Sequence, residues 1–129
     1  MVGIVIVAHS RALAEGVAEV ARAMGVGKAV VEPAGGDPDG GLGTSIVAVE
    51  RAVEAASDGD DGVLLLADLG SSVLTAEMVV EDARAGTVLL ADAPLVEGAV
   101  AAASMAAAGA DLAAVHAAAE SARDHRKRS

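Results

Sequence analysis

Short apolar runs alternate with segments of helical period along the whole chain, and this alternation constrains the fold more than any other feature. The run VGIVIVA at residues 2–8 is continuous and rich in β-branched residues, as in strands that are buried on both faces of a parallel sheet. Shorter runs follow at residues 29–32, 63–67 and 87–91. Four strand–helix repeats predict an α/β fold with helices on both faces of a parallel sheet.

The segments between these runs have the composition of helices and turns. Ser10 is a good N-cap for a helix that ends near Gly25, in which the apolar positions Leu13, Val17, Val20 and Met24 recur at helical spacing. Turn-forming residues gather at 33–45, 57–62 and 68–72, and Thr44 or Ser45 is placed to cap the helix that follows them. Further helices are predicted over residues 73–83, 95–108 and 112–125, the last one capped by Asp111.

The length of 129 residues suits a single domain, which we expect to span residues 1–122 and to be followed by a charged tail at 123–129. The chain has no Phe, Tyr or Trp, so its core has to be built from Val, Leu, Ile, Met and Ala. We expect the doubly wound strand order 2-1-3-4, in which the first and third strands are neighbours.

Charge and composition exclude several classes of partner. The net charge of −10 disfavours nucleic acids and anionic membranes and predicts a basic partner protein, and the lack of aromatic residues removes the usual stacking platform for single strands. The chain has no Cys, and its first apolar run is too short for a signal peptide or a membrane span. These features favour the cytoplasm.

The chemistry is expected beyond the carboxyl ends of the strands, where open parallel sheets bind their ligands. His9 follows the first strand, Asp68 the third and Asp92 the fourth. An imidazole can accept and release a phosphoryl group, and a carboxylate on one ring nitrogen leaves the other free to attack. His9 could instead serve only to cap or pack a strand end, and Asp92 could simply cap the helix that starts near Pro94.

The residues after Asp68 add to the phosphoryl interpretation. Gly70, Ser71 and Ser72 open a helix, whose free backbone N–H groups favour a bound phosphate. The glycine-rich loop at 33–45 has neither a P-loop nor a dinucleotide-binding pattern.

Other polar residues have simpler interpretations. His116 and His125 are expected to be surface or packing residues. A hydrolase built on Ser10, His9 and Asp68 is disfavoured, because Ser10 adjoins His9 and the chain lacks a nucleophile elbow.

Together these segments resemble a known family. The stretches GIVIVAHSRALAEGV (3–17), AGGDPDGGLGTSI (34–46), GVLLLADLGSS (62–72) and LADAPLVEGAVAAA (90–103) are similar to the phosphotransferase subunit of the PTS-dependent bacterial dihydroxyacetone kinase, which is itself mannose-type IIA-like. The resemblance runs from Val2 to about Glu120. It implies a mannose-type EIIA-like fold and a homodimer, and the alanine-rich helices at 95–108 and 111–122 are consistent with pairing of two copies.

The resemblance also implies a route for the phosphoryl group. His9 would receive it from the histidine phosphocarrier protein HPr and pass it to ADP bound on the nucleotide-binding subunit of the kinase. Asp68 would orient the ring. Gly70, Ser71 and Ser72 would hold the phosphoryl oxygens with Thr44 and Ser45 as helpers, and no metal or cofactor is expected. Because the chain ends at Ser129, we expect the further phosphocarrier and enzyme I-like domains of some relatives to be separate proteins here. The alternatives are a mannose-type sugar IIA component and a regulator that acts through its phosphorylation state.

Overall fold

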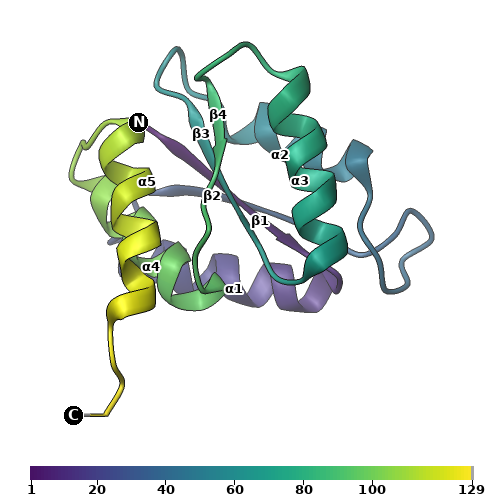
Figure 1. Ribbon diagram of the computed structural model, residues 1–129, viewed down its shortest axis with the longest axis horizontal. Helices are drawn as coiled ribbons and strands as arrows, with labels where there is room; N and C mark the ends of the chain where they lie inside the picture. The colour runs from purple at the N-terminus through teal and green to yellow at the C-terminus, as the bar shows by residue number, and fades with distance from the viewer. Residues whose placement is uncertain (129) are drawn as a thin grey trace.

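The computed structural model describes residues 1–128 and shows four strands alternating with helices (Figure 1). The strands are β1 (Gly3–Ala8), β2 (Val30–Gly35), β3 (Val63–Ala67) and β4 (Val88–Leu90). The helices are α1 (Arg11–Met24), α2 (Ile46–Ala56), α3 (Gly70–Asp82), α4 (Leu95–Ala107) and α5 (Leu112–Ser121), followed by a short 3-10 turn at Ala122–Asp124. The tail's last residue, Ser129, lies outside the described residues.

All four strands run parallel, in the order β2-β1-β3-β4. Ile4 of β1 lies opposite Val31 of β2 on one side and Leu64 of β3 on the other. The predicted α/β class and strand order are therefore confirmed. With this order, the carboxyl ends of β1 and β3 lie next to each other at one edge of the sheet.

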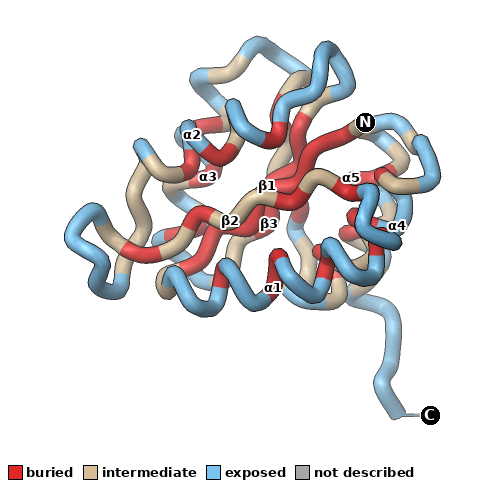
Figure 2. The backbone as a smooth tube through the Cα atoms, turned by 180° about the vertical axis from the view of Figure 1, so that it is seen from behind, coloured by how far each residue is buried: buried red, intermediate tan, exposed pale blue. Residues whose placement is uncertain are grey.

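Helices cover both faces of the sheet, and the buried residues follow the strands through the middle of the molecule (Figure 2). Ile4, Ile6, Leu64 and Leu66 pack against α1, α4 and α5. The alternate strand positions face α2 and α3; they are Val5, Val7, Val63 and Leu65. Because the strands are buried on both faces, they carry continuous apolar runs rather than an alternating pattern.

Strand β2 is longer than the sequence predicts. It continues through Pro33, Ala34 and Gly35, which the turn-forming composition predicts to lie in the following loop. Proline is tolerated here because β2 is an edge strand that pairs with β1 alone. Gly35 is the last residue of the strand. A side chain at this position would collide with the backbone carbonyl of Ser10, and because glycine has none, β2 can lie close to the start of α1.

The buried face of α1 also differs from the prediction. Of the periodic residues Leu13, Val17, Val20 and Met24, only Val17 is buried; the other three are between 43% and 55% exposed. The helix instead buries small residues, namely Ala14, Ala18 and Ala21. Helix α1 packs closely against β2 and α4, and alanines permit this close approach while larger side chains remain at the rim.

The C-terminal helix ends earlier than predicted, at Ser121, and the chain then leaves the body of the molecule (Figure 1). Two cations of this segment bind back to the body: Arg123 pairs with Asp92, and Lys127 lies 2.7 Å from Glu97. Among residues 1–128, no helix combines the length and the apolar character needed to cross a membrane.

Candidate active site

His9 and Asp68 meet at the carboxyl edge of the sheet because their strands are neighbours. His9 directly follows β1 and Asp68 directly follows β3, and Val7 pairs with Ala67 at the ends of these strands. The backbone N–H of Asp68 donates to the carbonyl of Val7 over 3.1 Å, which continues the pairing by one residue beyond the strands. The sheet therefore fixes the spacing between the two side chains.

The Asp68 carboxylate binds both the ring and the backbone of His9. Its Oδ1 lies 3.0 Å from His9 Nδ1, and its Oδ2 accepts the backbone N–H of His9, also over 3.0 Å. The backbone N–H of Leu69 donates to Oδ1 over 2.7 Å. These bonds hold the carboxylate in one orientation, which in turn fixes the plane of the imidazole.

This environment lowers the pKa of Asp68 from 3.8 to about 2. Burial acts in the opposite direction and is the largest single influence, since the side chain is only 9% exposed. It is outweighed by the hydrogen bonds from the backbone of His9, the hydroxyl of Ser72, the His9 ring and the backbone of Leu69. Asp68 is therefore an anion at neutral pH and can only accept hydrogen bonds.

An acceptor on Nδ1 determines the tautomer of the neutral ring. Nδ1 carries the proton that is donated to Asp68, and Nε2 keeps its lone pair. The His9 side chain is 27% exposed. The Ser71 hydroxyl is hydrogen-bonded to Nε2, and Ser71 in turn lies 3.4 Å from the hydroxyl of Thr44. The geometry gives a nucleophilic nitrogen at a partly open surface, with hydroxyl groups beside it.

Helix α3 starts earlier than predicted, at Gly70 instead of residue 73. Ser71 and Ser72 therefore lie in its first turn. The N-cap position belongs to Leu69, which makes no side-chain cap bond. Ser72 is fully buried, and its hydroxyl lies 3.1 Å from His9 Nδ1. The hydroxyls of both serines contact the His9 ring, so the first turn of α3 forms part of the candidate site.

The glycine-rich loop reaches His9 through its backbone. The N–H of Gly43 donates to the carbonyl of His9 over 2.8 Å, at a φ of +144° that favours glycine. Asp37 holds the loop together by accepting the N–H groups of Asp39 and Gly41. Ser45, by contrast, caps α2: its hydroxyl accepts the N–H of Ala48 over 3.2 Å.

Sequence reasoning missed Thr75 and the contact of Gly43. The hydroxyl of Thr75 donates to that of Thr44 over 3.4 Å. Thr75 lies four residues after Ser71, which places both on one face of α3, and this spacing was the signal that could have identified it. The backbone contact of Gly43 depends on the path of the loop and has no side-chain signal.

The remaining polar residues of interest lie outside this cluster. Asp92 does not cap α4, whose N-cap is Pro94; its backbone N–H donates to Glu120, and its carboxylate pairs with Arg123. His116 pairs with Glu120 one helical turn away. Ser10 caps α1 by accepting the N–H of Leu13 over 3.2 Å, which leaves the hydrolase alternative without support.

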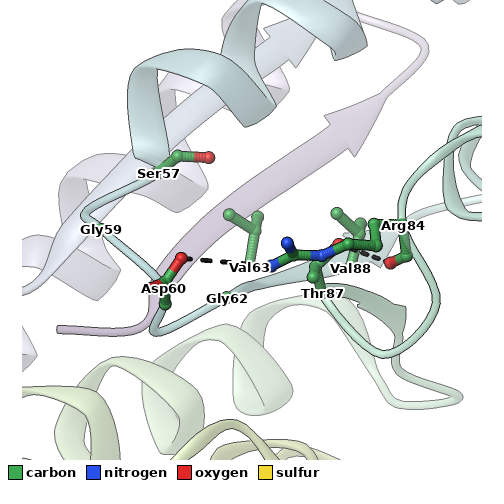
Figure 3. Close-up of a pocket in the computed structure, with 8 residues that line it drawn as sticks. All are labelled: Ser57, Gly59, Asp60, Gly62, Val63, Arg84, Thr87 and Val88. Carbon is green, nitrogen blue, oxygen red and sulfur yellow. Dashed lines mark hydrogen bonds and ion pairs between the residues drawn. The ribbon is translucent and has the colours of Figure 1, made fainter.

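A hollow of about 300 Å³ lies at the opposite end of the sheet, where β3 and β4 begin (Figure 3). It is crossed by an ion pair between Arg84 and Asp60 at 4.0 Å, both of which are strongly exposed. Thr87 closes the turn beside it by donating to the carbonyl of Arg84. This hollow shares no residue with the His9 cluster. Within residues 1–128, no three His, Cys, Asp or Glu side chains come together as a metal site would require.

Comparison with known proteins identifies the family of the chain. The family model for EIIA-man, described as the fructose IIA component of the PTS, matches residues 3–116. The chain belongs to the mannose-type IIA family. It is 43% identical over 118 residues to the phosphoryl donor subunit DhaM of the PEP-dependent dihydroxyacetone kinase of Escherichia coli, covering 87% of this chain and 25% of that protein.

A shorter relative matches over most of its own length. The phosphoryl donor subunit DhaM of dihydroxyacetone kinase 1 of Listeria innocua is 36% identical, over 79% of each chain. The crystal structure of EF1359, described as a protein of unknown function, superposes with a TM-score of 0.79 at 32% identity and covers 92% of both chains. This mannose-type IIA protein is thus DhaM-like, and it spans about a quarter of the length of the Escherichia coli relative.

Proposed function

We propose that this chain carries a phosphoryl group on Nε2 of His9, as the phosphoryl donor subunit of a PEP-dependent dihydroxyacetone kinase. The observation that carries the proposal is the pairing of His9 Nδ1 with Asp68 at 3.0 Å in a DhaM-like chain. That pairing leaves Nε2 unprotonated, next to the hydroxyl of Ser71 and the start of a helix.

On the side of this chain, the transfer step uses only His9, as the nucleophile, and Asp68, which holds its ring. The lone pair of Nε2 forms a bond to the phosphorus of the donor's phosphohistidine, and the donor's N–P bond breaks with its electrons returning to the donor's ring nitrogen. The proton on Nδ1 stays between His9 and Asp68 throughout. The ring becomes positively charged when it is phosphorylated, and the anionic Asp68 stabilises this charge. Delivery to the proposed acceptor follows the same pattern: a terminal phosphate oxygen of ADP bonds to the phosphorus, and the Nε2–P bond breaks with its electrons returning to Nε2.

The start of α3 is proposed to hold the phosphoryl oxygens. The backbone N–H groups of Gly70, Ser71 and Ser72 begin the helix and carry the positive end of its dipole. The Ser71 hydroxyl adds a donor, and Thr44 acts through Ser71. Ser45, named above as a helper, is left out of this set because its hydroxyl caps α2.

The proposed donor is HPr and the proposed acceptor is ADP on the nucleotide-binding subunit of the kinase. A net charge of −10 suits basic partner surfaces and would speed their encounter at low salt. The proposal includes residence in the cytoplasm, in keeping with the absence of cysteine.

The first prediction follows directly. The chain is mixed with enzyme I, HPr and labelled phosphoenolpyruvate, and we expect acid-labile label on the wild type and none on His9→Ala. His116→Ala is the matched control, because His116 lies on α5 and pairs with Glu120 of the same helix. Label that persists on His9→Ala, or that is lost only with His116→Ala, contradicts the assignment.

The family model's description favours a second candidate, a sugar-type IIA component. Passing the labelled protein to the nucleotide-binding kinase subunit with ADP distinguishes the two. Formation of ATP supports the kinase subunit. Transfer to a sugar-type IIB component, without ATP formation, supports the alternative.

We also propose a homodimer, which is the second prediction. Helix α4 buries its alanines against the body, yet Val96 and Met105 on its outer side stay 46% and 36% exposed. A twofold pairing would cover them. Light scattering at micromolar concentration is expected to give twice the chain mass of 12.5 kDa, and the mass of a single chain would contradict the proposal.

A further inference from the structure

A row of three hydroxyl groups leads from the middle of α3 to the nucleophilic nitrogen. Thr75 Oγ1 lies 3.4 Å from Thr44 Oγ1, Thr44 Oγ1 lies 3.4 Å from Ser71 Oγ, and Ser71 is hydrogen-bonded to His9 Nε2. Thr44 and Thr75 are half-buried, whereas Ser71 is exposed. The row therefore connects the open face of the site to the more buried side of α3.

Hydrogen-bond chemistry gives this row a single direction from the histidine end. Asp68 can only accept, so His9 Nδ1 donates to it and Nε2 is an acceptor. Ser71 must then use its one proton on Nε2. It can only accept from Thr44, and Thr44, having used its proton, can only accept from Thr75.

The other end of the row requires the same direction. The geometry of the outermost bond makes Thr75 the donor and Thr44 the acceptor. The two ends thus agree, and every hydroxyl in the row donates toward His9. Hydrogen bonds arranged in series polarise one another, so the last donor, Ser71, is the one strengthened.

We propose that Thr75 and Thr44 are positioning residues that keep the Ser71 proton turned toward His9. In the unphosphorylated protein the Ser71 hydroxyl donates this proton in a hydrogen bond to Nε2. Once Nε2 has formed its bond to phosphorus it has no lone pair left, and the Ser71 proton turns to a phosphoryl oxygen, the acceptor now next to it. The turn of the Ser71 proton to a phosphoryl oxygen rests on the proposed function, whereas its orientation toward Nε2 in the unphosphorylated protein does not.

Loss of the Thr75 hydroxyl removes the constraint while leaving Ser71 in place. Thr44 can then accept the proton of Ser71 as readily as it donates its own, so Ser71 spends part of its time turned away from the histidine. The Thr75→Val variant keeps the shape of the side chain and removes only the hydroxyl. The Thr75→Ser variant restores the hydroxyl and serves as the rescue.

The matched control is Thr87→Val, the same substitution at a threonine whose hydroxyl donates to the carbonyl of Arg84 at the opposite end of the sheet. The first measurement is the nitrogen-15 chemical shift of His9 Nε2 in the full, unphosphorylated chain. The second is the lifetime of phosphohistidine after chemical phosphorylation with phosphoramidate, a small donor that needs no partner protein.

In Thr75→Val we expect the Nε2 signal to move toward that of an imidazole without a hydrogen bond, and the phosphohistidine lifetime to fall about fivefold. Thr75→Ser should return both values toward the wild type, and Thr87→Val should change neither. Thr44→Val removes the competing acceptor of the Ser71 proton together with the donor, so its Nε2 signal should move less than that of Thr75→Val. Values for Thr75→Val equal to those of the wild type, or an equal loss in Thr75→Ser, would overturn the inference.

The two measurements keep this inference separate from the proposed function. If the wild type forms no phosphohistidine on His9 with either phosphoramidate or the protein donors, the proposed function fails. The Nε2 shift of the variants then still decides whether the hydroxyl row orients Ser71.

Discussion

The start of α3 differs from the starts of α1, α2 and α5, although all four have polar residues of the capping type nearby. Helices α1, α2 and α5 are capped by the side chains of Ser10, Ser45 and Asp111, each of which accepts a backbone N–H from the first turn. Helix α3 has no side-chain cap. Its two serines turn away from their own helix and toward His9.

The comparison teaches that the same residue type serves stability or chemistry according to what lies opposite. A capped helix has one of its free N–H groups occupied, whereas an uncapped start keeps them for an anion. Asp68 does not replace the missing cap, because its oxygens accept from His9, from the backbone N–H of Leu69 and from the Ser72 hydroxyl. We therefore expect substitutions at α3 to affect phosphotransfer, and substitutions at the capped starts to affect folding.

The third prediction, with the largest expected effect of those that test this comparison, concerns Asp68. Asp68→Asn should slow phosphorylation of His9 by about 10- to 100-fold, because an amide no longer selects the tautomer with the proton on Nδ1. Rapid-quench measurement of the labelled protein gives the rate. Asp111→Asn is the control at a capped start, and we expect its rate to match the wild type. An unchanged rate in Asp68→Asn removes the carboxylate from the mechanism.

The fourth prediction concerns pH. The pKa of Asp68 is about 2 in the folded protein, whereas its ordinary value, which applies in the unfolded chain, is 3.8. The unfolded chain therefore binds the proton more tightly. The ionised carboxylate therefore stabilises the fold by about 2 kcal/mol above pH 5, and this contribution is lost as the pH falls from about 4 to 2.

Urea unfolding of the wild type and of Asp68→Asn at pH 6 and pH 3 checks this expectation. The difference in unfolding free energy between the two proteins should shrink by about half of that amount at pH 3. A difference that is the same at both values would mean that the folded structure does not lower the pKa of Asp68.

The fifth prediction has the smallest effect and separates the two kinds of helix start. Ser45→Ala should lower the unfolding free energy by about 1 kcal/mol through loss of the α2 cap, and should leave the rate of phosphorylation unchanged. Ser71→Ala should change stability by less than about 0.5 kcal/mol, because the side chain is exposed, and should slow phosphorylation. Equal effects of both variants on both measurements would abolish the distinction.

Much of the fold could be predicted because the strands are buried on both faces. A strand in that setting needs a continuous apolar run, and β1 and β3 were placed correctly for this reason. The end of β2 was misplaced because Pro33 and Gly35 are turn residues in most settings, and only the edge position of β2 permits them. The buried face of α1 was misjudged because alanine carries a weak hydrophobic signal yet allows the closest packing.

Some residues of the candidate site could be predicted from the sequence and others could not. His9 and Asp68 were found because each follows a strand, and strand ends can be read from local composition. Thr75 and the backbone of Gly43 were not found, since their relevance depends on a loop and a helix coming within hydrogen-bond distance of one another. Ser71 and Ser72 were predicted to hold the phosphoryl oxygens, but their hydrogen bonds to the ring nitrogens of His9 depend on the same tertiary contacts.

By itself the sequence determined the element order, the layered architecture and the presence of a histidine and a carboxylate at strand ends, because apolar periodicity and turn chemistry are local properties of a chain. The tertiary structure alone decided which hydroxyls face His9, which ring nitrogen keeps its lone pair and that the serines at the start of α3 contact His9 instead of capping their helix. These depend on distances between groups as much as 63 residues apart in the chain, such as His9 and Ser72, and only the pairing of β1 with β3 brings such groups together.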